Sequence, residues 1–230
     1  QAVLFVFLFL RFITEYKYEW NVALGHSVFH AISAFNNAGF ALYSDSLMSF
    51  ARDGWIIIPI FVGAFMGSLG FPVLSESWDR LKNNTKKLLG RKYDFMPVQW
   101  SLNSRIILWA SLILVVGGTV YIAILEWNNP KTLGPLDPIT KIFDSIFAAI
   151  MPRTAGFNAQ DITAMHPSTW LGMDVLMFIG GGSASTAGGI KIGTAVVLFY
   201  VIYTEIRGEA AVNIGNRRLP RSMQRQAFTI

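Results

Sequence analysis

The sequence predicts an all-α membrane protein built from repeated helix–loop–helix modules, and three observations support this prediction. Hydrophobic residues make up 53% and charged residues 14% of the chain, whereas soluble domains carry about 25% charged residues. Apolar runs long enough to cross a bilayer alternate with shorter apolar runs that are not. The motif SVFHAISAFNNAGF at Ser27–Phe40 recurs as SIFAAIMPRTAGF at Ser145–Phe157, so the architecture rests on an internal repeat.

The charge and cysteine content exclude several kinds of site. In a membrane protein a net charge of +5 indicates basic cytoplasmic loops and not nucleic-acid binding. The absence of cysteine excludes disulfides, zinc thiolate sites and cysteine nucleophiles. His26 and His30 share a helix face, but no third ligand is nearby, so packing or hydrogen bonding is favoured over a metal pair.

The first repeat is expected over residues 1–82. Gln1–Leu10 is apolar but shorter than the roughly 20 residues of a span, like the second half of a helix whose beginning is missing. A short helix over about Ala23–Phe35 leads into a first turn, Asn36–Phe40. Trp55–Leu74 then contains no charge and is long enough to cross the membrane.

A basic linker, residues 83–105, separates this repeat from the second, which is expected over residues 106–206. Lys and Arg greatly outnumber Asp around the linker, so the positive-inside rule places it in the cytoplasm. The second repeat contains a span at Ile106–Leu125, a short helix at about Ile139–Met151 and a second turn, Arg153–Phe157.

The last apolar region, Pro167–Thr204, is longer than one span and contains a glycine-rich loop, Gly180–Lys191. Each Gly costs a helix about 1 kcal/mol relative to Ala. Non-helical backbone at membrane depth requires surrounding protein or a water-filled cavity. We therefore expect two half-helices joined by an intramembrane loop, whose candidate residues are Gly180, Gly181, Gly182, Ser183, Ala184, Ser185, Thr186, Ala187, Gly188, Gly189 and Lys191.

The two glycine turns favour a pathway for cations. A cation that leaves water needs oxygen ligands, which backbone carbonyls supply without adding fixed charge. Glycine permits the φ angles that aim successive carbonyls inward, and the C-terminal end of a short helix adds a partial negative charge. One span on each side of the cytoplasmic linker places both turns on the outer side, as re-entrant loops. A single turn would fit an ordinary helix–turn–helix connection, whereas two turns in matching context favour a pore.

The repeat, the Asn-Ala-Gly-Phe and Arg-Thr-Ala-Gly-Phe turns, and the Gly-Gly-Gly-Ser-Ala-Ser-Thr-Ala-Gly-Gly-Ile-Lys loop resemble the KtrB/TrkH-type membrane subunits of the Ktr/Trk/HKT potassium transporter superfamily. The resemblance implies helix–pore-loop–helix (MPM) modules with re-entrant pore helices and a broken intramembrane helix. Residues 1–82 and 106–206 resemble the second and third of four such repeats, the former with a truncated first helix. Residues 207–230 resemble a cytoplasmic lead-in to a missing fourth.

The resemblance further implies potassium uptake across the bacterial plasma membrane, with Na⁺ as a candidate coupling ion and no cofactor bound by this chain. Carbonyls of Asn37, Ala38, Thr154 and Ala155 would bind K⁺, and the Gly180–Gly189 loop would be a gate beneath them. The implied K⁺ selectivity filter consists of Asn36, Asn37, Ala38, Gly39, Phe40, Arg153, Thr154, Ala155, Gly156 and Phe157.

The partners implied by the resemblance are membrane lipid, a second copy in a homodimer, and a cytoplasmic ring of nucleotide-binding RCK subunits of the KtrA/TrkA type. The basic segments Lys82–Lys92 and Arg207–Arg225 are candidate surfaces for that ring. Positive-inside anchoring explains them equally well.

Three further expectations complete the sequence reading. A pore for another monovalent cation, Na⁺ or NH₄⁺, is one alternative function. A membrane enzyme is a weaker one, with Ser183, Ser185 and Lys191 as a nucleophile–base set or the glycine run as a phosphate cradle. The acid/base partners of a hydrolase are not recognisable, and Lys191, between isoleucines, does not match a phosphate-binding loop. Arg153 could raise a barrier to cations at the mouth of the filter, but pairing with Asp161 or another acid, which would hold the second turn in shape, is favoured.

Overall fold

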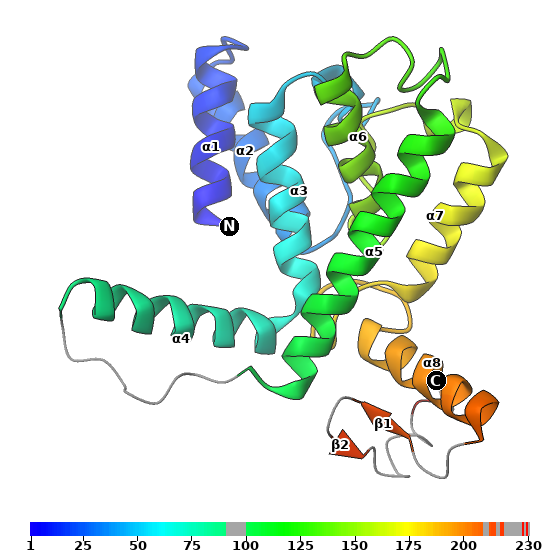
Figure 1. Cartoon of the computed structure of the whole chain (residues 1–230). Coiled ribbons are helices and arrows are strands. Elements are labelled where there is room, and N and C mark those ends of the chain that lie inside the picture. The colour runs from blue at the N-terminus through cyan, green and yellow to red at the C-terminus, as the bar shows by residue number, and fades with distance from the viewer. Residues whose placement is uncertain (91–99, 209–211, 215–216, 219–226, 228, 230) are drawn as a thin grey trace.

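The computed structural model describes residues 1–90, 100–208, 212–214, 217–218, 227 and 229, and its bulk is a bundle of helices (Figure 1). One group of packed helices contains α1 (Ala2–Thr14), α2 (Trp20–Phe35) and α3 (Gly54–Leu69). A second group contains α5 (Leu102–Glu126), α6 (Pro138–Ile150), α7 (Pro167–Ile179) and α8 (Ile192–Arg207). The remaining elements are α4 (Phe71–Leu88), the 3₁₀ turns η1 (Met48–Phe50) and η2 (Ile162–Ala164), and the antiparallel pair β1 (Asn213–Ile214) and β2 (Arg217–Arg218).

The two groups repeat one arrangement, in which a helix is followed by a short helix, a turn and a further helix. The repeated serines of the sequence motif make the same bond in both copies. Ser27 Oγ donates to the Ala23 carbonyl at 2.6 Å, and Ser145 Oγ donates to the Lys141 carbonyl at 2.7 Å. Because α3 packs against α6, the two groups meet along the short helix of the second.

The short helices and the broken helix follow the sequence expectations closely. α2 begins at Trp20, three residues before the expected start, and α6 begins at Pro138, where Asp137 caps it by accepting from the Thr140 N–H. α7 and α8 are the two expected half-helices, and the glycine-rich loop joins them. α5 is 25 residues long and is the helix of the described ranges that is apolar and long enough to cross a membrane by itself.

The expected unbroken span at Trp55–Leu74 is wrong. The chain bends by 107° between α3 and α4, so that α4 leaves the bundle sideways (Figure 1). Gly70, at the corner, has φ of +89°, and a Cβ atom there would lie 2.3 Å from the Ser183 carbonyl oxygen. Glycine is therefore the residue that permits both the backbone angle and the close approach.

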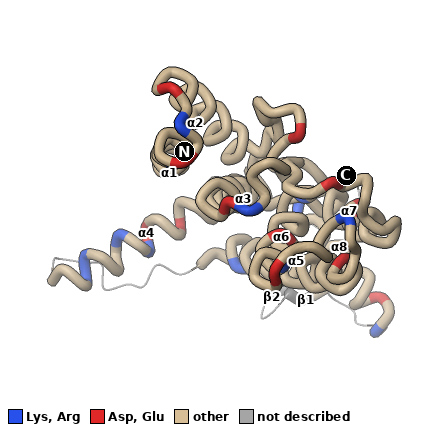
Figure 2. The backbone as a smooth tube through the Cα atoms, turned by 90° about the horizontal axis from the view of Figure 1, so that it is seen from above, with Lys and Arg blue, Asp and Glu red and all other residues tan. Residues whose placement is uncertain are grey.

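Helix α4 carries much of the basic character expected of the linker, and Lys and Arg mark it in Figure 2. The helix continues across the expected boundary between residues 82 and 83. In the two basic segments and the expected lead-in at 207–230, residues 91–92, 209–211, 215–216, 219–226, 228 and 230 lie outside the described part of the chain.

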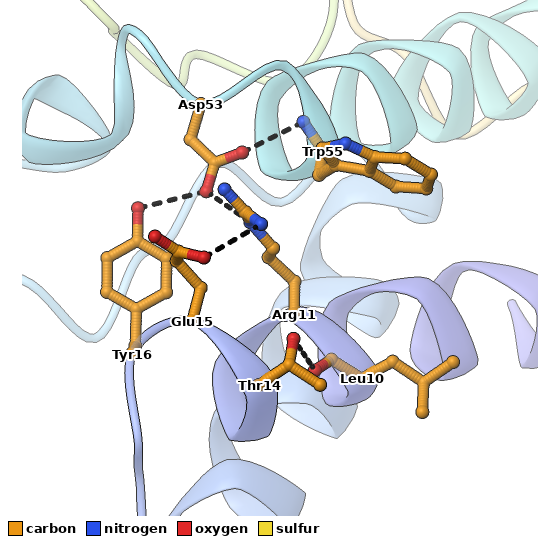
Figure 3. Close-up of polar contacts among 7 residues, drawn as sticks. All are labelled: Leu10, Arg11, Thr14, Glu15, Tyr16, Asp53 and Trp55. Carbon is orange, nitrogen blue, oxygen red and sulfur yellow. Dashed lines mark hydrogen bonds and ion pairs between the residues drawn. The ribbon is translucent and has the colours of Figure 1, made fainter.

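A carboxylate joins the end of α1 to the start of α3 (Figure 3). Asp53 caps α3 by accepting from the Trp55 N–H at 3.0 Å. Its other oxygen accepts from Arg11 Nε at 2.8 Å and from the Tyr16 hydroxyl at 3.0 Å. The Asp53 side chain is only 8% exposed, so these donors replace the water that burial removes.

A second carboxylate joins the end of α5 to the start of α7. Glu126 is fully buried and accepts from the Thr169 hydroxyl at 2.5 Å and the His166 N–H at 2.8 Å. Its other oxygen accepts from the Asn129 amide at 2.6 Å and the Thr132 hydroxyl at 2.7 Å. Four donors thus compensate the desolvation of one buried charge.

We expect Asp53→Ala to lower the free energy of unfolding by about 1–3 kcal/mol, because it removes a helix cap and a charge-assisted contact between α1 and α3. Glu19→Ala is the matched control, since Glu19 stands at the N-cap of α2 without a side-chain capping bond. Thermal unfolding of the full-length protein in detergent measures the stability of the two variants. Equal melting temperatures for the two variants would contradict a stabilising role for Asp53.

Candidate functional site

The first and second turns both follow the end of a short helix and both contain glycine in the left-handed region. Gly39 has φ of +74° and Gly156 has φ of +80°. In the second turn the Met151 carbonyl accepts from the N–H groups of Thr154, Ala155 and Gly156 at 3.2, 3.1 and 2.8 Å. The turn is therefore wound around the last carbonyls of α6, whose C-terminal end carries a partial negative charge.

The two turns lie side by side. A Cβ atom at Gly39 would be 1.8 Å from the Ala155 carbonyl oxygen, a separation that no side chain could tolerate. The contact continues beyond the turns, where the Leu47 N–H donates to the Asn158 carbonyl at 3.0 Å. Asn37 and Thr154, which are 117 positions apart and were predicted to belong to one site, are thus brought together.

The ten candidate filter residues differ in exposure. Asn36, Ala38, Phe40 and Gly156 are exposed, and Asn37, Gly39 and Thr154 are half-buried. Arg153, Ala155 and Phe157 are buried, and Ala155 and Phe157 belong to a core that also contains residues of α1, α2 and α3. Phe157 therefore anchors the second turn in the protein interior.

The histidines of α2 hold the segment after the first turn, as packing and hydrogen-bonding residues. His30 Nδ1 donates to the His26 carbonyl at 2.7 Å, and its Nε2 lies 3.4 Å from the Leu42 N–H that donates to it. His26 Nδ1 is 2.8 Å from the Tyr43 hydroxyl. Both rings therefore have their contacts in the protein.

The glycine-rich loop is held on one side by the corner between α3 and α4. The Gly182 N–H donates to the Ser68 carbonyl at 2.7 Å, and the Phe71 N–H donates to the Ala184 carbonyl at 3.1 Å. Sequence reasoning missed this partner, because it treated the corner as the middle of one helix. Gly70, inside an apolar run, was the available signal.

The middle of the loop is held by the first turn. Asn37 Nδ2 donates to the Thr186 hydroxyl at 2.6 Å, and Asn37 Oδ1 accepts from the Thr154 hydroxyl of the second turn. The sequence analysis predicted Asn37 and Thr154 as ligands through their backbone carbonyls and Thr186 as a residue of the gate loop. It did not predict the side-chain contacts among the three.

Arg153 does not pair with Asp161. Arg153 as a whole residue is 2% exposed, and its Nη2 donates to the Gly180 carbonyl at 3.2 Å, where the glycine-rich loop begins. Asp161 instead accepts from the hydroxyl and N–H of Thr163, which holds the pKa of its carboxyl below the ordinary value. Arg153 thus joins the second turn to the loop through a carbonyl oxygen and not through an ion pair.

Two members of the nucleophile–base set in the enzyme alternative, Ser185 and Lys191, make hydrogen bonds with backbone oxygens. Lys191 Nζ donates to the Ala187 carbonyl, and Ser185 Oγ donates to the Gly182 carbonyl at 2.6 Å. Both side chains are therefore engaged with backbone oxygens of their own loop.

Comparison with known proteins assigns this arrangement to a family. The family described as "TrkH: Cation transport protein" matches residues 1–230. The Ktr system potassium uptake protein B of Bacillus subtilis is 39% identical over 203 residues, covering 88% of this chain and 42% of that protein. The protein of the same name from Vibrio alginolyticus is 38% identical over 208 residues, covering 90% of this chain and 42% of that protein.

Two more distant relatives extend the comparison. The potassium/sodium uptake protein NtpJ of Enterococcus hirae is 29% identical over 232 residues, covering 100% of this chain and 47% of that protein. The crystal structure of the potassium transporter TrkH from Vibrio parahaemolyticus matches the fold with a TM-score of 0.69 at 15% identity, covering 99% of this chain and 45% of that chain. The chain therefore spans less than half the length of the relatives it matches.

We expect Gly39→Ala to destabilise the protein more than Gly156→Ala. Both substitutions place a side chain at positive φ, which costs about 1–2 kcal/mol. Only the Cβ atom at position 39 meets the Ala155 carbonyl, because nothing lies within 4 Å of a Cβ atom at position 156. Thermal stability of the full-length protein in detergent distinguishes the two. A Gly39→Ala variant as stable as Gly156→Ala would mean that the turns are not in contact.

Proposed function

The chain belongs to the TrkH family of cation transport proteins, and on this basis we propose that its full-length protein takes up potassium across the bacterial plasma membrane. In this proposal the first and second turns are two parts of the selectivity filter, and the glycine-rich loop is a gate beneath them. The observation that carries the proposal is the contact of the two turns, each at the end of a short helix.

The geometry of the turns supports cation binding by backbone oxygens. The C-terminal ends of α2 and α6 both lead into the site, and their partial negative charges attract a cation. Carbonyls of Asn37, Ala38, Thr154 and Ala155 would replace part of the hydration shell of K⁺. Potassium is the substrate and is not a resident cofactor.

The loop contacts support a gate that responds to its surroundings. The loop is non-helical, joins α7 to α8 and touches both turns, through Arg153 and Asn37. The loop also contacts the corner at the start of α4, a helix that carries several Lys and Arg residues and projects from the bundle (Figure 2). We propose that α4 and the basic segment after α8 face the cytoplasm, where an RCK ring and a second copy of the protein would dock.

A sodium pathway is the second candidate, and the similarity to a relative named a potassium/sodium uptake protein favours testing it. The same competition experiment, described next, tests an ammonium pathway. Na⁺ remains a candidate coupling ion in this proposal. The enzyme alternative is set aside, because the family is one of transport proteins.

The direct test is uptake of ⁸⁶Rb⁺ into liposomes that contain the full-length protein, with and without a cytoplasmic RCK partner. We expect K⁺ in excess to block uptake and Na⁺ or NH₄⁺ to block it weakly, because a carbonyl filter recognises the size and hydration of K⁺ and Rb⁺ alike. Equal competition by Na⁺ would establish the second candidate. Absence of flux under both conditions would refute transport by this protein.

Shortening the loop by removing Ala184–Gly188 is expected to raise the ⁸⁶Rb⁺ flux several-fold, because the missing residues would no longer obstruct the path. Removal of the same number of residues from the loop at 128–132 is not a suitable control, since Asn129 and Thr132 are buried and donate hydrogen bonds to Glu126. Replacement of Ala184, Ser185 and Ala187 by glycine keeps both the loop length and Thr186, and this glycine-filled loop serves as the control instead. Equal flux from the shortened and the glycine-filled loops would leave the segment without a gating role.

A further inference from the structure

One side-chain amide connects the three segments of the site. Asn37 belongs to the first turn, its Oδ1 accepts from the Thr154 hydroxyl of the second turn, and its Nδ2 donates to the Thr186 hydroxyl of the glycine-rich loop at 2.6 Å. These residues are separated by 117 and 149 positions in the sequence, so the contact is created by the tertiary structure.

The chemistry of the contact requires an amide. Thr186 accepts from Asn37, and its own hydroxyl lies 3.3 Å from both the Phe35 and the Gly67 carbonyl oxygens, to which it can donate. Asn37 must therefore supply a donor toward Thr186 and an acceptor toward Thr154, and asparagine carries both on one group. Its φ of +55° lies in the left-handed region, which asparagine tolerates better than most residues.

The position of Thr186 within the loop gives the contact its consequence. The backbone bonds to the corner between α3 and α4 hold residues 182 and 184, and Arg153 holds residue 180. The Ile190 N–H returns to α7 by donating to the Phe178 carbonyl at 3.0 Å. These hydrogen bonds hold the first half and the end of the loop. The Thr186 side chain connects the middle of the loop to the end of α2, to α3 and to the first turn.

We propose that Asn37 is a positioning residue that latches the middle of the gate loop to both turns of the filter, so that the loop opens only when the Asn37–Thr186 bond breaks. This inference rests on the proposed function. When the bond breaks, the amide keeps only its contact with Thr154, so the state of the loop and the side-chain contacts of the filter are coupled. The latch consists of Asn37, Thr154 and Thr186.

The test compares maximal rates of ⁸⁶Rb⁺ uptake, per amount of folded full-length protein, in liposomes. Thr186→Val keeps the size and branching of the side chain but removes the hydroxyl, and with it both the bond from Asn37 and the donation to the Phe35 and Gly67 carbonyls. It should raise the maximal rate at least about 3- to 10-fold, the change in an equilibrium expected from the loss of a hydrogen bond. Thr186→Ser restores the hydroxyl and should bring the rate back toward that of the wild type. Thr204→Val is the matched control, because the Thr204 hydroxyl donates to the Tyr200 carbonyl within α8, away from the latch.

A double-mutant cycle tests the coupling between gate and filter. Thr154→Val should raise the rate less in the Thr186→Val background than in the wild type, because the Asn37 amide is already released from the loop. Independent effects of the two substitutions would overturn the coupling. A Thr186→Val rate at or below that of the wild type, confirmed with Thr186→Ala, would overturn the latch, since loss of folded protein is removed by the normalisation. If the wild type itself shows no uptake, the proposed function fails first, and the inference fails with it.

Discussion

The rest of the structure depends on the way in which two helices end inside the molecule. A helix leaves its last carbonyls without partners in the helix, and an unsatisfied buried carbonyl costs free energy. At the end of α6, the Met151 carbonyl accepts three N–H groups of the second turn. At the end of α2, the Phe35 carbonyl lies 3.3 Å from the Thr186 hydroxyl of the glycine-rich loop. The same requirement therefore shapes the second turn and brings the loop to the first.

The corner between α3 and α4 supplies hydrogen-bond partners to the backbone of the glycine-rich loop. Because the chain changes direction at Gly70, the Ser68 carbonyl and the Phe71 N–H are not used within a continuous helix and can pair with Gly182 and Ala184. Non-helical backbone needs such partners wherever water is excluded. The sharp bend that sends α4 out of the bundle and the irregular loop between α7 and α8 are thus two halves of one hydrogen-bonded arrangement (Figure 1).

Two buried charges in this arrangement are satisfied to different extents. Glu126 accepts four hydrogen bonds and joins the end of α5 to the start of α7. Arg153 donates to a single carbonyl, that of Gly180, while its Nε and Nη1 have no hydrogen-bond partner among the described residues. Burial of a charge is costly unless it is paired. The Arg153 guanidinium therefore has less compensation for its burial than the Glu126 carboxylate has.

Much of the fold and the positions of the two glycine turns follow from the sequence, because they depend on local properties of the chain. Apolar runs set the helices, the glycine run breaks the last helix, and the repeated motif identifies both turns, all of which the structure contains. The close contact of the turns, the side-chain roles of Asn37 and Thr186 and the family assignment required more than the pattern of one sequence.

The corner at Gly70 and the true partner of Arg153 show what only the tertiary structure decided. A charge-free run from Trp55 to Leu74 looks like one span, since its composition does not reveal that Ser183 packs against the single glycine at the bend. The sequence likewise offers Arg153 a nearby acid in Asp161, yet that acid is satisfied by Thr163, two residues away. Local patterns determine which segments are helical and where they stop. Contacts between separate segments, from 27 positions apart for Arg153 and Gly180 to 149 for Asn37 and Thr186, depend on the packing of the whole bundle, and they assemble the candidate site.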